Sequence, residues 1–495
     1  MKLSQLLKKS NHVRTVVNFN DFEVKGISEN SNLIKNYFIF AAIQGNQLNG
    51  EEFICKIDKS KIVAVIISKN HKLKELSSFT YIYSNDVRKL YAELASVLYP
   101  NSISNKVSVT GTNGKTSVAF YTSQIWRKLN FNCGSVGTLG ITYNKKKIFN
   151  SQLTTPSPEI NHRYLSVLSK MGCEKIIFEA SSIGLEQKRL YPIKFDVVAF
   201  TNLSHDHLDY HKTFKKYKLS KLLLFNDYVK KKAVAVIYSD SEYSKYFIKF
   251  CHKKKIEILD YGKKAKFFKI SSVKSFSNYS VISVFYKTKQ YEMKVFGNSY
   301  FEICNKICSL LIVFGKNLSS ENFKHIEKLR NPDGRLEHIF KNNIVSVFVD
   351  YAHTPDALEN VLSTLKNKTE GRLILVFGCG GERDKSKRPV MTRIALKFSD
   401  IVFITEDNSR FEDPNKIFKQ MTKDLGKKDL KKIQIIQDRE KAINEAIRIT
   451  KEKDIVLIAG KGHENYQIIK GNTKYFSDKE VALKNLNKKK NVDRT

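Results

Sequence analysis

The segment with the clearest chemistry is TGTNGKT, residues 110–116. It follows an apolar run and opens a stretch of helical periodicity. Glycines there would let backbone N–H groups wrap phosphates, and a helix N-terminus adds positive potential. Lys115 would reach the terminal phosphates and Thr116 would ligate Mg²⁺. The GxxGKT spacing is shorter than the common GxxxxGK[ST], and a chance glycine turn is the alternative, but the strand–turn–helix context favours nucleotide binding. The predicted phosphate-binding residues are Gly111, Thr112, Asn113, Gly114, Lys115 and Thr116.

Two further segments offer metal or acid–base chemistry. Glu179 ends an apolar strand, which is where a Mg²⁺ ligand or a water-orienting acid belongs beside a phosphate-binding loop. Residues 202–211, NLSHDHLDYH, carry three histidines and two aspartates. Zinc is one reading of that group, but the neighbouring glycine loop favours Mg²⁺ and a nucleotide. For His205 and His211, a polar loop with chance histidines stays open as the alternative.

Four polar or glycine-rich turns in the last third of the chain each follow an apolar run. Their sequences are DYAHTP (350–355), GCGGERD (378–384), DNSR (407–410) and GKGHE (460–464). Each alone is an ordinary turn between a strand and a helix. If the runs are parallel strands, however, their carboxyl ends line one crevice. The pattern therefore predicts a binding site along one edge of a sheet.

The elements that must position these residues indicate an α/β protein of three domains. Residues 1–104 form a small N-terminal α/β domain, 105–332 a central P-loop ATPase-like α/β domain, and 333–495 a C-terminal Rossmann-like, doubly wound domain. In the C-terminal part, strand-like runs alternate with helical stretches, which predicts a parallel sheet with right-handed crossovers. The predicted C-terminal strands are Ile344–Val349, Leu373–Phe377, Ile401–Thr405, Ile433–Ile436 and Ile455–Ala459.

Composition narrows the class of protein further. Lys plus Arg is 86 and Asp plus Glu is 49, giving a formal charge of +37 over 495 residues. A polyanion-binding protein is one reading of that charge, but the lysines are spread along the chain and form no basic stripe interleaved with aromatic residues. A lysine-rich solvated surface is the preferred interpretation, without nucleic-acid binding. We see no signal peptide, no apolar run near the ~20 residues of a membrane span and no cysteine framework, so we expect a cytoplasmic protein with buried thiols.

With these segments in hand, the chain resembles the Mur ligase family over residues 105–470. The motifs that carry the resemblance occur in the family's order: TGTNGKT, EASSIGLEQKR, TNLSHDHLDYH, DGRLE, DYAHTP, GCGGERDKSKRP, DNSRFEDP and GKGHENYQ. The resemblance implies ATP-dependent amide synthesis in peptidoglycan precursor assembly. The acceptor would be UDP-N-acetylmuramoyl-L-alanyl-D-glutamate, activated as an acyl phosphate and then attacked by an amine. The family's Mg²⁺ requirement and a monomer are expected as well.

The resemblance also assigns roles by position. It places the γ-phosphate on Lys115 and the remaining ATP contacts on Asn305 (adenine), Arg335 (phosphate side) and Asp350 (ribose). It makes Lys115, Lys221, His207 and Glu179 catalytic, with Thr116, Glu179, His207 and carbamylated Lys221 as metal ligands. It assigns the UDP-sugar peptide to Asn30, Thr154, Thr155, Ser181, Gln187 and Arg189.

Lys221 matches the family's carbamylated lysine, ten residues after His211. A desolvated neutral amine can add CO₂, which would turn a cation into an anionic ligand close to Mg²⁺. One more surface lysine is the alternative. The leucines at 219, 222, 223 and 224 argue against an exposed helix face and favour the functional interpretation.

The amino acid implied by the resemblance is meso-diaminopimelate. Arg410, with Arg383, would bind its carboxylate, and Glu464 with Asp407 would take its ammonium. L-Lysine lacks the second carboxylate. Sites built around such polar pairs discriminate between substrates with and without the group by roughly 10⁴-fold or more. The residues assigned to this substrate are Arg383, Asp407, Asn408, Ser409, Arg410, Gly460 and Glu464. A lysine-adding ligase and a folylpolyglutamate synthetase are the nearest alternatives.

The chain departs from the family's pattern at four places. Ser409 replaces a proline, and Leu153 and Glu302 stand where asparagines are usual. In the N-terminal domain, Glu29-Asn30-Ser31 replaces the Asp-Ser-Arg that binds uridine.

Overall fold

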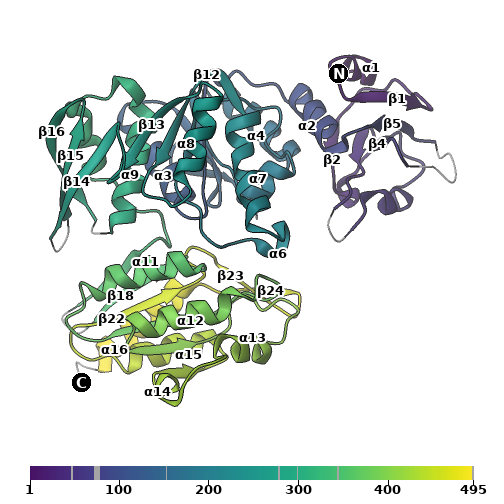
Figure 1. The fold of residues 1–495 in the computed structure, drawn as a ribbon. Helices are drawn as coiled ribbons and strands as arrows, with labels where there is room; N and C mark the ends of the chain where they lie inside the picture. The colour runs from purple at the N-terminus through teal and green to yellow at the C-terminus, as the bar shows by residue number, and fades with distance from the viewer. Residues whose placement is uncertain are drawn as a thin grey trace.

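The computed structural model describes residues 1–45, 48–71, 78–151, 153–276, 279–297, 299–342 and 345–492, with side chains up to 487. Three sheets divide the chain in sequence order, and Figure 1 shows them as a purple, a teal and a green-to-yellow body. The α/β architecture predicted from the sequence is confirmed. The boundaries at 104/105 and 332/333 stay predictions.

The N-terminal body contains a five-stranded sheet in the order β1-β5-β4-β3-β2. Asp86 caps the helix that follows the sheet by accepting a hydrogen bond from the Lys89 backbone N–H. That helix packs onto the sheet through Leu90, Tyr91 and Leu94. The elements are α1 (Leu3–Leu7), β1 (Val13–Val17), β2 (Gly26–Ser28), η1 (Ser31–Leu33), β3 (Phe38–Ala41), η2 (Gly50–Lys56), β4 (Ala64–Ser68), β5 (Thr80–Ser84) and α2 (Val87–Leu98).

The central body contains an eleven-stranded sheet in the order β16-β15-β14-β13-β12-β11-β6-β10-β7-β8-β9. Its strands are β6 (Asn105–Thr110), β7 (Cys133–Gly137), β8 (Gly140–Tyr143), β9 (Lys146–Phe149), β10 (Lys175–Glu179), β11 (Phe195–Phe200), β12 (Val229–Tyr238), β13 (Glu257–Gly262), β14 (Phe268–Ser275), β15 (Tyr279–Tyr286) and β16 (Lys289–Phe296). Its helices are α3 (Lys115–Lys128), α4 (Pro158–Lys170), α5 (Ser182–Glu186), α6 (Leu208–His211), α7 (Phe214–Asp227), α8 (Ser244–Lys253), α9 (Tyr300–Phe314), η3 (Gly315–Asn317), η4 (Ser320–Phe323) and α10 (Lys324–Glu327).

Strand β6 lies in the middle of this sheet, between β10 and β11 and parallel to both. Its alternation places Val107 and Val109 in the core that α3 and α9 cover. A second core, on the other face of the sheet, packs Phe178 and Phe200 against Phe225 of α7. The carboxyl ends of β6, β10 and β11 therefore lie side by side, and they carry the glycine loop, Glu179 and the 201–207 loop.

The C-terminal body contains a six-stranded sheet in the order β17-β18-β22-β19-β20-β21. Its elements are β17 (Glu337–Lys341), β18 (Val345–Asp350), α11 (Pro355–Lys366), β19 (Leu373–Phe377), α12 (Lys387–Phe398), β20 (Ile401–Ile404), α13 (Pro414–Met421), α14 (Lys427–Leu430), β21 (Ile433–Ile435), α15 (Arg439–Arg448), β22 (Asp454–Ala459), β23 (Tyr466–Ile469), β24 (Asn472–Tyr475) and α16 (Asp478–Val492). Five neighbouring strands are parallel, as predicted, and helices cover both faces.

Three features differ from the sequence-based expectations. The antiparallel edge strand β17 and the β23–β24 hairpin were not anticipated. The predicted strands Ile401–Thr405 and Ile433–Ile436 each end one residue earlier in the structure, whereas Ile344, where another strand was predicted to start, lies outside the described residues. Cys55 is exposed, so the expectation of buried thiols is wrong for that residue, because it lies on the surface helix η2. Among the described residues, no helix combines the length and apolarity that crossing a membrane requires.

Candidate active site

The glycine loop is held between β6 and α3. Gly114 has φ +88°, a left-handed conformation that favours glycine, and a Cβ there would lie 2.6 Å from Asn305 Oδ1. A Cβ on Gly111 would lie 1.9 Å from Thr201 Oγ1. Both glycines are therefore required by close neighbours, which explains the spacing seen in the sequence.

A second loop, residues 201–204, fixes the conformation of the first. Asn202 Oδ1 accepts a hydrogen bond from the Asn113 N–H at 2.9 Å, and its Nδ2 donates to the Asn113 carbonyl at 3.1 Å. Thr201 Oγ1 donates to the same carbonyl at 2.6 Å. Thr112 Oγ1 accepts from the Ser204 N–H at 3.0 Å. The sequence placed Asn202 and Thr201 close to the glycine loop but gave no sign of this bracing role.

Two lysines converge on the loop. Lys115 Nζ donates to the carbonyls of Gly111 and Thr112, both at 2.8 Å, and Lys221 Nζ donates to the Gly111 carbonyl at 2.8 Å. Lys221 is 1% exposed, and burial, followed by the nearby Lys115 charge, lowers its pKa well below the ordinary value. Burial lowers the pKa of Lys115 as well. The buried position predicted for Lys221 is confirmed, although Leu219 on the same helix is 40% exposed because it faces away from that core.

Glu179 is the acidic centre of this region. One of its carboxylate oxygens accepts from Thr116 Oγ1 at 2.8 Å and Thr138 Oγ1 at 3.1 Å, and the other accepts from the Thr138 N–H at 3.0 Å. A Cβ on Gly137 would lie 2.0 Å from Glu179 Oε1, so the small residue makes room for the carboxylate. Thr138 was not identified from the sequence, where it is one threonine in a short turn.

The histidines of residues 205–211 have different surroundings. His207 has φ +54°, and its Nε2 lies 3.3 Å from Asp206 Oδ2. Burial lowers the pKa of His207. Burial would raise the pKa of Asp206, but the charges of His207 and Lys387 outweigh it and lower that pKa. His211 is buried, with Nδ1 3.0 Å from Glu186 Oε2, and burial lowers its pKa to about 4.

The predicted metal ligands do not form a closed cage. Among the described residues, no group of three or more His, Cys, Asp or Glu side chains is arranged to hold a metal ion. Thr116 and Glu179 are in direct contact, and His207 lies on the neighbouring loop. That donor set suits a cation that takes most of its ligands from phosphates and water, as Mg²⁺ does.

Most of the residues predicted to hold the UDP-sugar peptide form one connected group. Thr155 Oγ1 lies 3.0 Å from Ser181 Oγ, and the Thr155 carbonyl accepts from Arg189 Nη1 at 2.9 Å. Arg189 also donates twice to Gln187 Oε1, at 3.0 and 2.7 Å. Thr154 is joined to this network through Thr138, at 3.1 Å. Asn30 differs, since it is exposed and its side chain caps η1.

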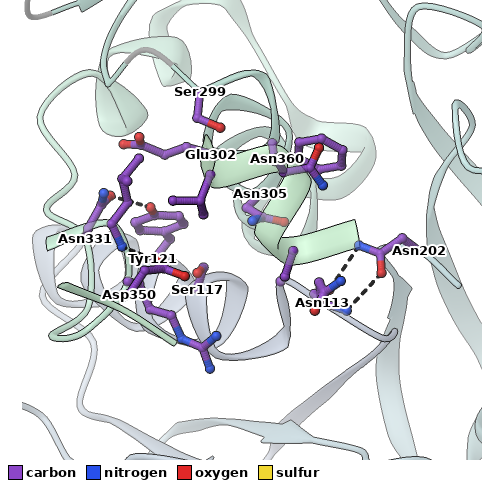
Figure 2. A pocket seen from close by; sticks show the side chains of 16 residues that line it. Asn113, Ser117, Tyr121, Asn202, Ser299, Glu302, Asn305, Asn331, Asp350 and Asn360 are labelled. Carbon is purple, nitrogen blue, oxygen red and sulfur yellow. Dashed lines mark hydrogen bonds between the residues drawn. The ribbon is translucent and has the colours of Figure 1, made fainter. Parts of the chain in front are cut away.

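A pocket extends from the glycine loop toward α9 and the C-terminal body (Figure 2). Asn305, Arg335 and Asp350 all line it, together with Tyr121, Glu302 and Asn331, which were not assigned to the nucleotide. Arg335 donates to Thr116 Oγ1 at 3.2 Å and lies 4.4 Å from the Tyr351 ring centroid. Asp350 accepts from the backbone N–H groups of Leu336 and Ala352 at 2.5 and 2.6 Å, and burial raises its pKa.

The predicted crevice residues of the C-terminal body meet at the carboxyl ends of β18, β19, β20 and β22. Arg410, at φ +55°, donates from Nη1 to the carbonyls of Gly381 and Asn408 at 2.8 and 3.1 Å. Ser409 is 1% exposed, and its hydroxyl has no partner among the described residues. Arg383 is 47% exposed and faces Asp209 of the central body at 3.9 Å, so it lies at the rim of the crevice.

An acidic pair in this crevice is tied to a lysine of the chain. Buried Lys461 Nζ lies 3.1 Å from Glu464 Oε2 and 3.7 Å from Asp407 Oδ1. Asn408 Nδ2 donates to Glu464 at 3.1 Å, and burial raises the pKa of Glu464. Gly460 has φ +115°, and a Cβ there would lie 3.1 Å from Asp407 Oδ2. The two carboxylates exceed the single ammonium by one negative charge.

A buried ion pair supports the GCGGERD loop from below. Arg388, fully buried, donates to both carboxylate oxygens of Glu412 at 2.6 and 2.8 Å and to the Gly380 carbonyl at 3.0 Å. These hydrogen bonds lower the pKa of Glu412 to about 2. Arg388 stood in a motif recognised from the sequence, but nothing there indicated that it was structural.

The central and C-terminal bodies touch through polar contacts at the site. Asn113 Nδ2 donates to Asp356 Oδ2 at 2.8 Å, and His205 Nε2 lies 2.6 Å from Asp384 Oδ2. Figure 1 shows α11, which carries Asp356, along the side of the C-terminal body that faces the central one. The glycine loop and the 201–211 segment are therefore in contact with the C-terminal body.

Comparisons with known proteins agree with this geometry. The family description "Mur ligase middle domain" matches residues 109–313, and "Mur ligase, glutamate ligase domain" matches residues 334–462. A UDP-N-acetylmuramoyl-L-alanyl-D-glutamate--2,6-diaminopimelate ligase of Aquifex aeolicus is 38% identical over 93% of both chains. The ligase of the same name from Clostridium tetani is 35% identical over 97% of this chain and 98% of its own.

Solved structures give the same picture. A structure titled as that diaminopimelate ligase superposes with a TM-score of 0.63 at 28% identity, covering 94% of this chain and 95% of its own. A Mycobacterium tuberculosis folylpolyglutamate synthase complexed with ADP and AMPPCP shares the fold, with a TM-score of 0.60 at 15% identity over 74% of this chain and 91% of its own. The chain belongs to the Mur ligase family.

Proposed function

We propose that the protein joins meso-2,6-diaminopimelate to the D-glutamyl carboxylate of UDP-N-acetylmuramoyl-L-alanyl-D-glutamate, with ATP converted to ADP and phosphate. Relatives of that name, 35–38% identical over nearly the whole chain, support the reaction. The observation that carries the proposal is that the Asn113–Asp356 contact brings a glycine loop next to a crevice with both an arginine and an acidic pair.

In the first step, an oxygen of the D-glutamyl carboxylate attacks the γ-phosphorus, ADP leaves, and an acyl phosphate forms. The loop N–H groups hold the phosphates, and Lys115 exchanges its two carbonyl acceptors for γ-phosphate oxygens. Arg335, next to Thr116, adds positive charge on the phosphate side. The loop thus supplies positioning and charge neutralisation, which are the main requirements of phosphoryl transfer.

The residues around Thr116 fit a Mg²⁺ ion bound mainly through phosphates. Thr116 Oγ1, Glu179 and His207 would hold it, and it would neutralise charge between the β- and γ-phosphates when bound. Thr138 keeps the Glu179 carboxylate oriented by donating to both of its oxygens.

Lys221 is suited to carbamylation. Its burial and the Lys115 charge favour a neutral amine, which can add CO₂ and release a proton. The product is an anion next to the Gly111 carbonyl, where an ammonium would otherwise repel Lys115. The carbamate would then be a further ligand on the metal side of the loop.

In the second step, the amine attacks the acyl carbon, and phosphate leaves from the tetrahedral intermediate. Arg410 uses the guanidinium nitrogens not engaged by backbone carbonyls to bind the distal carboxylate of diaminopimelate. Glu464 and Asp407, with their one excess negative charge, bind its distal ammonium. Thr154, Thr155, Ser181, Gln187 and Arg189 hold the sugar-linked peptide, and Asn30 contributes from the N-terminal body.

The proposal is tested by measuring ADP release with the UDP-muramoyl dipeptide and either meso-diaminopimelate or L-lysine. Release should require the dipeptide and diaminopimelate together, with L-lysine slower by several orders of magnitude. Acceptance of L-lysine with rejection of diaminopimelate would overturn the choice of amino acid. We also propose that the reaction takes place in the cytoplasm, because its substrates are nucleotides, and that the protein is a monomer, because the site is assembled from one chain.

A further inference from the structure

The nucleotide pocket has two chemically distinct ends. Asn113 and Asn202, on the phosphate side, lie at one end, and Tyr121, Glu302 and Asn331 lie at the other (Figure 2). A nucleotide with its phosphates on the glycine loop would therefore extend its base toward α9. The lining residues at that end decide which base fits.

Glu302 is the charged residue at the base end. Its side chain is 11% exposed, and Oε1 lies 2.7 Å from the ammonium of Lys306, which is fully buried. Lys306 also donates to the Phe296 carbonyl. No described residue donates a hydrogen bond to Glu302 Oε2. The pocket wall thus presents one carboxylate oxygen that has no donor among the described residues, on a side chain held in place by a buried cation.

Asn305 lies one turn further along α9. A Cβ on Gly114 would lie 2.6 Å from Asn305 Oδ1, so its amide sits over the last glycine of the loop. No hydrogen bond connects that amide to another described residue. An asparagine amide pairs with the N6 and N7 edge of adenine through two hydrogen bonds.

We propose that Glu302 accepts a hydrogen bond from the second hydrogen of the adenine N6 amine. This contact would make the pocket selective for adenine over 6-oxopurines. Asn305 Oδ1 accepts the first N6 hydrogen, and Glu302 Oε2 accepts the second. Hypoxanthine or guanine would place the O6 acceptor against a carboxylate that has no proton to donate. This inference rests on the proposed function only in taking the pocket to bind ATP.

Lys306 is a positioning residue in this arrangement. With Oε1 bound to Lys306, only Oε2 faces the base, so the wall accepts one hydrogen bond rather than two. Guanine recognition by a carboxylate uses the adjacent N1–H and N2–H donors together, and a single free oxygen does not match that pair. The alternative is that Glu302 only neutralises Lys306, which predicts that replacing Glu302 leaves the preference for adenine over 6-oxopurines unchanged.

Nucleotide analogues test the proposal on the unaltered protein. We would measure binding of ADP, of inosine diphosphate, which has O6, and of purine riboside diphosphate, which has hydrogen at C6, all with Mg²⁺. ADP should bind roughly tenfold to 100-fold more tightly than inosine diphosphate, the range for one good polar pair to a base, with purine riboside diphosphate between them. Equal affinity for all three would overturn the proposal.

Glu302→Gln reverses the hydrogen bond without changing the side chain's shape. The glutamine oxygen would stay on Lys306, and the amide nitrogen would donate to O6. The variant should therefore bind ADP more weakly and inosine diphosphate more tightly. The two dissociation constants should then differ by no more than about threefold. The exposed Glu292→Gln serves as a matched control, and Glu302→Gln with Lys306→Met restores charge balance if the single variant folds poorly. An unchanged ratio in a folded variant would contradict the proposal.

Binding needs no amino acid, so the outcome is separable from ligase activity. Failure of ADP itself to bind would overturn both this inference and the proposed function. Tight binding of ADP and inosine diphosphate alike would overturn only the inference.

Discussion

The glycine-loop region and the C-terminal crevice both contain buried or half-buried cationic side chains, but the partners of these side chains differ. Lys115 and Lys221 donate to neutral backbone carbonyls, and no described carboxylate forms an ion pair with either. In the crevice, Lys461 is paired with Glu464 and Asp407, while Arg410 donates to carbonyls. The first region is therefore complementary to a polyanion, and the second to a molecule that carries both signs of charge. This contrast matches a nucleotide on one side and a zwitterionic amino acid on the other.

The largest expected effect comes from the loop side. Lys221→Ala removes both the buried amine and the proposed carbamate, and turnover should fall by about 10³-fold, as for loss of a preorganised charged group in an active site. Short carboxylic acids should restore part of the rate, because they can occupy the space of the carbamate. Steady-state ADP release measures both effects. Lys215→Ala, an exposed lysine on the same helix, is the control, and full activity of Lys221→Ala would rule out the carbamate.

A substitution in the crevice should change the KM for the amino acid rather than the turnover rate. Arg410→Lys keeps the charge but loses the planar fork, so KM for diaminopimelate should rise by about 100-fold while KM for ATP stays within about twofold. Initial rates at varied concentrations of each substrate separate the two. Arg393→Lys, at an exposed position of α12, is the control. A parallel rise in both constants would show that the two regions are not specialised as described.

Removing the contact that joins the two regions should reduce kcat/KM by a smaller factor. Asp356→Ala removes the 2.8 Å hydrogen bond from Asn113 across the two bodies, and kcat/KM should fall about threefold to tenfold. Combining it with Asn113→Ala in a double-mutant cycle isolates the coupling. Strict additivity of the two single effects would mean that the contact does not align the site.

Acid should weaken both regions through their buried histidines, because burial lowers the pKa of His162 in the central body and of His463 in the crevice. Burial lowers the pKa of His162 to about 4, so the folded state holds it neutral while the unfolded state is protonated below about pH 6.5. The stability it supports is fully present above that pH and declines by about 1.4 kcal/mol per unit as the pH falls toward 4. Burial also lowers the pKa of His353 to about 4, so His353 should act in the same direction.

Thermal unfolding from pH 7 to 4 measures this, and His162→Gln should flatten the profile. An identical pH profile in that variant would contradict the assignment.

The sequence predicted the two regions unequally. Regular periodicity located β19 to the residue, and the motif spacing placed Lys115, Glu179 and Lys221 in one region. Side-chain partners were harder to foresee. Thr138, Asn202 and Arg388 act through contacts with residues 24 to 89 positions away, and no local pattern encodes such contacts. Lys461 likewise showed its role only when folding placed it against Glu464 and Asp407.

The most direct test of the account follows an oxygen atom. The D-glutamyl carboxylate of the UDP-muramoyl dipeptide would be labelled with ¹⁸O, and the phosphate released in the complete reaction analysed by mass spectrometry. An acyl phosphate formed at the glycine loop and then attacked by the amine predicts one ¹⁸O atom in each phosphate. Phosphate without label, or release of AMP in place of ADP, would contradict it.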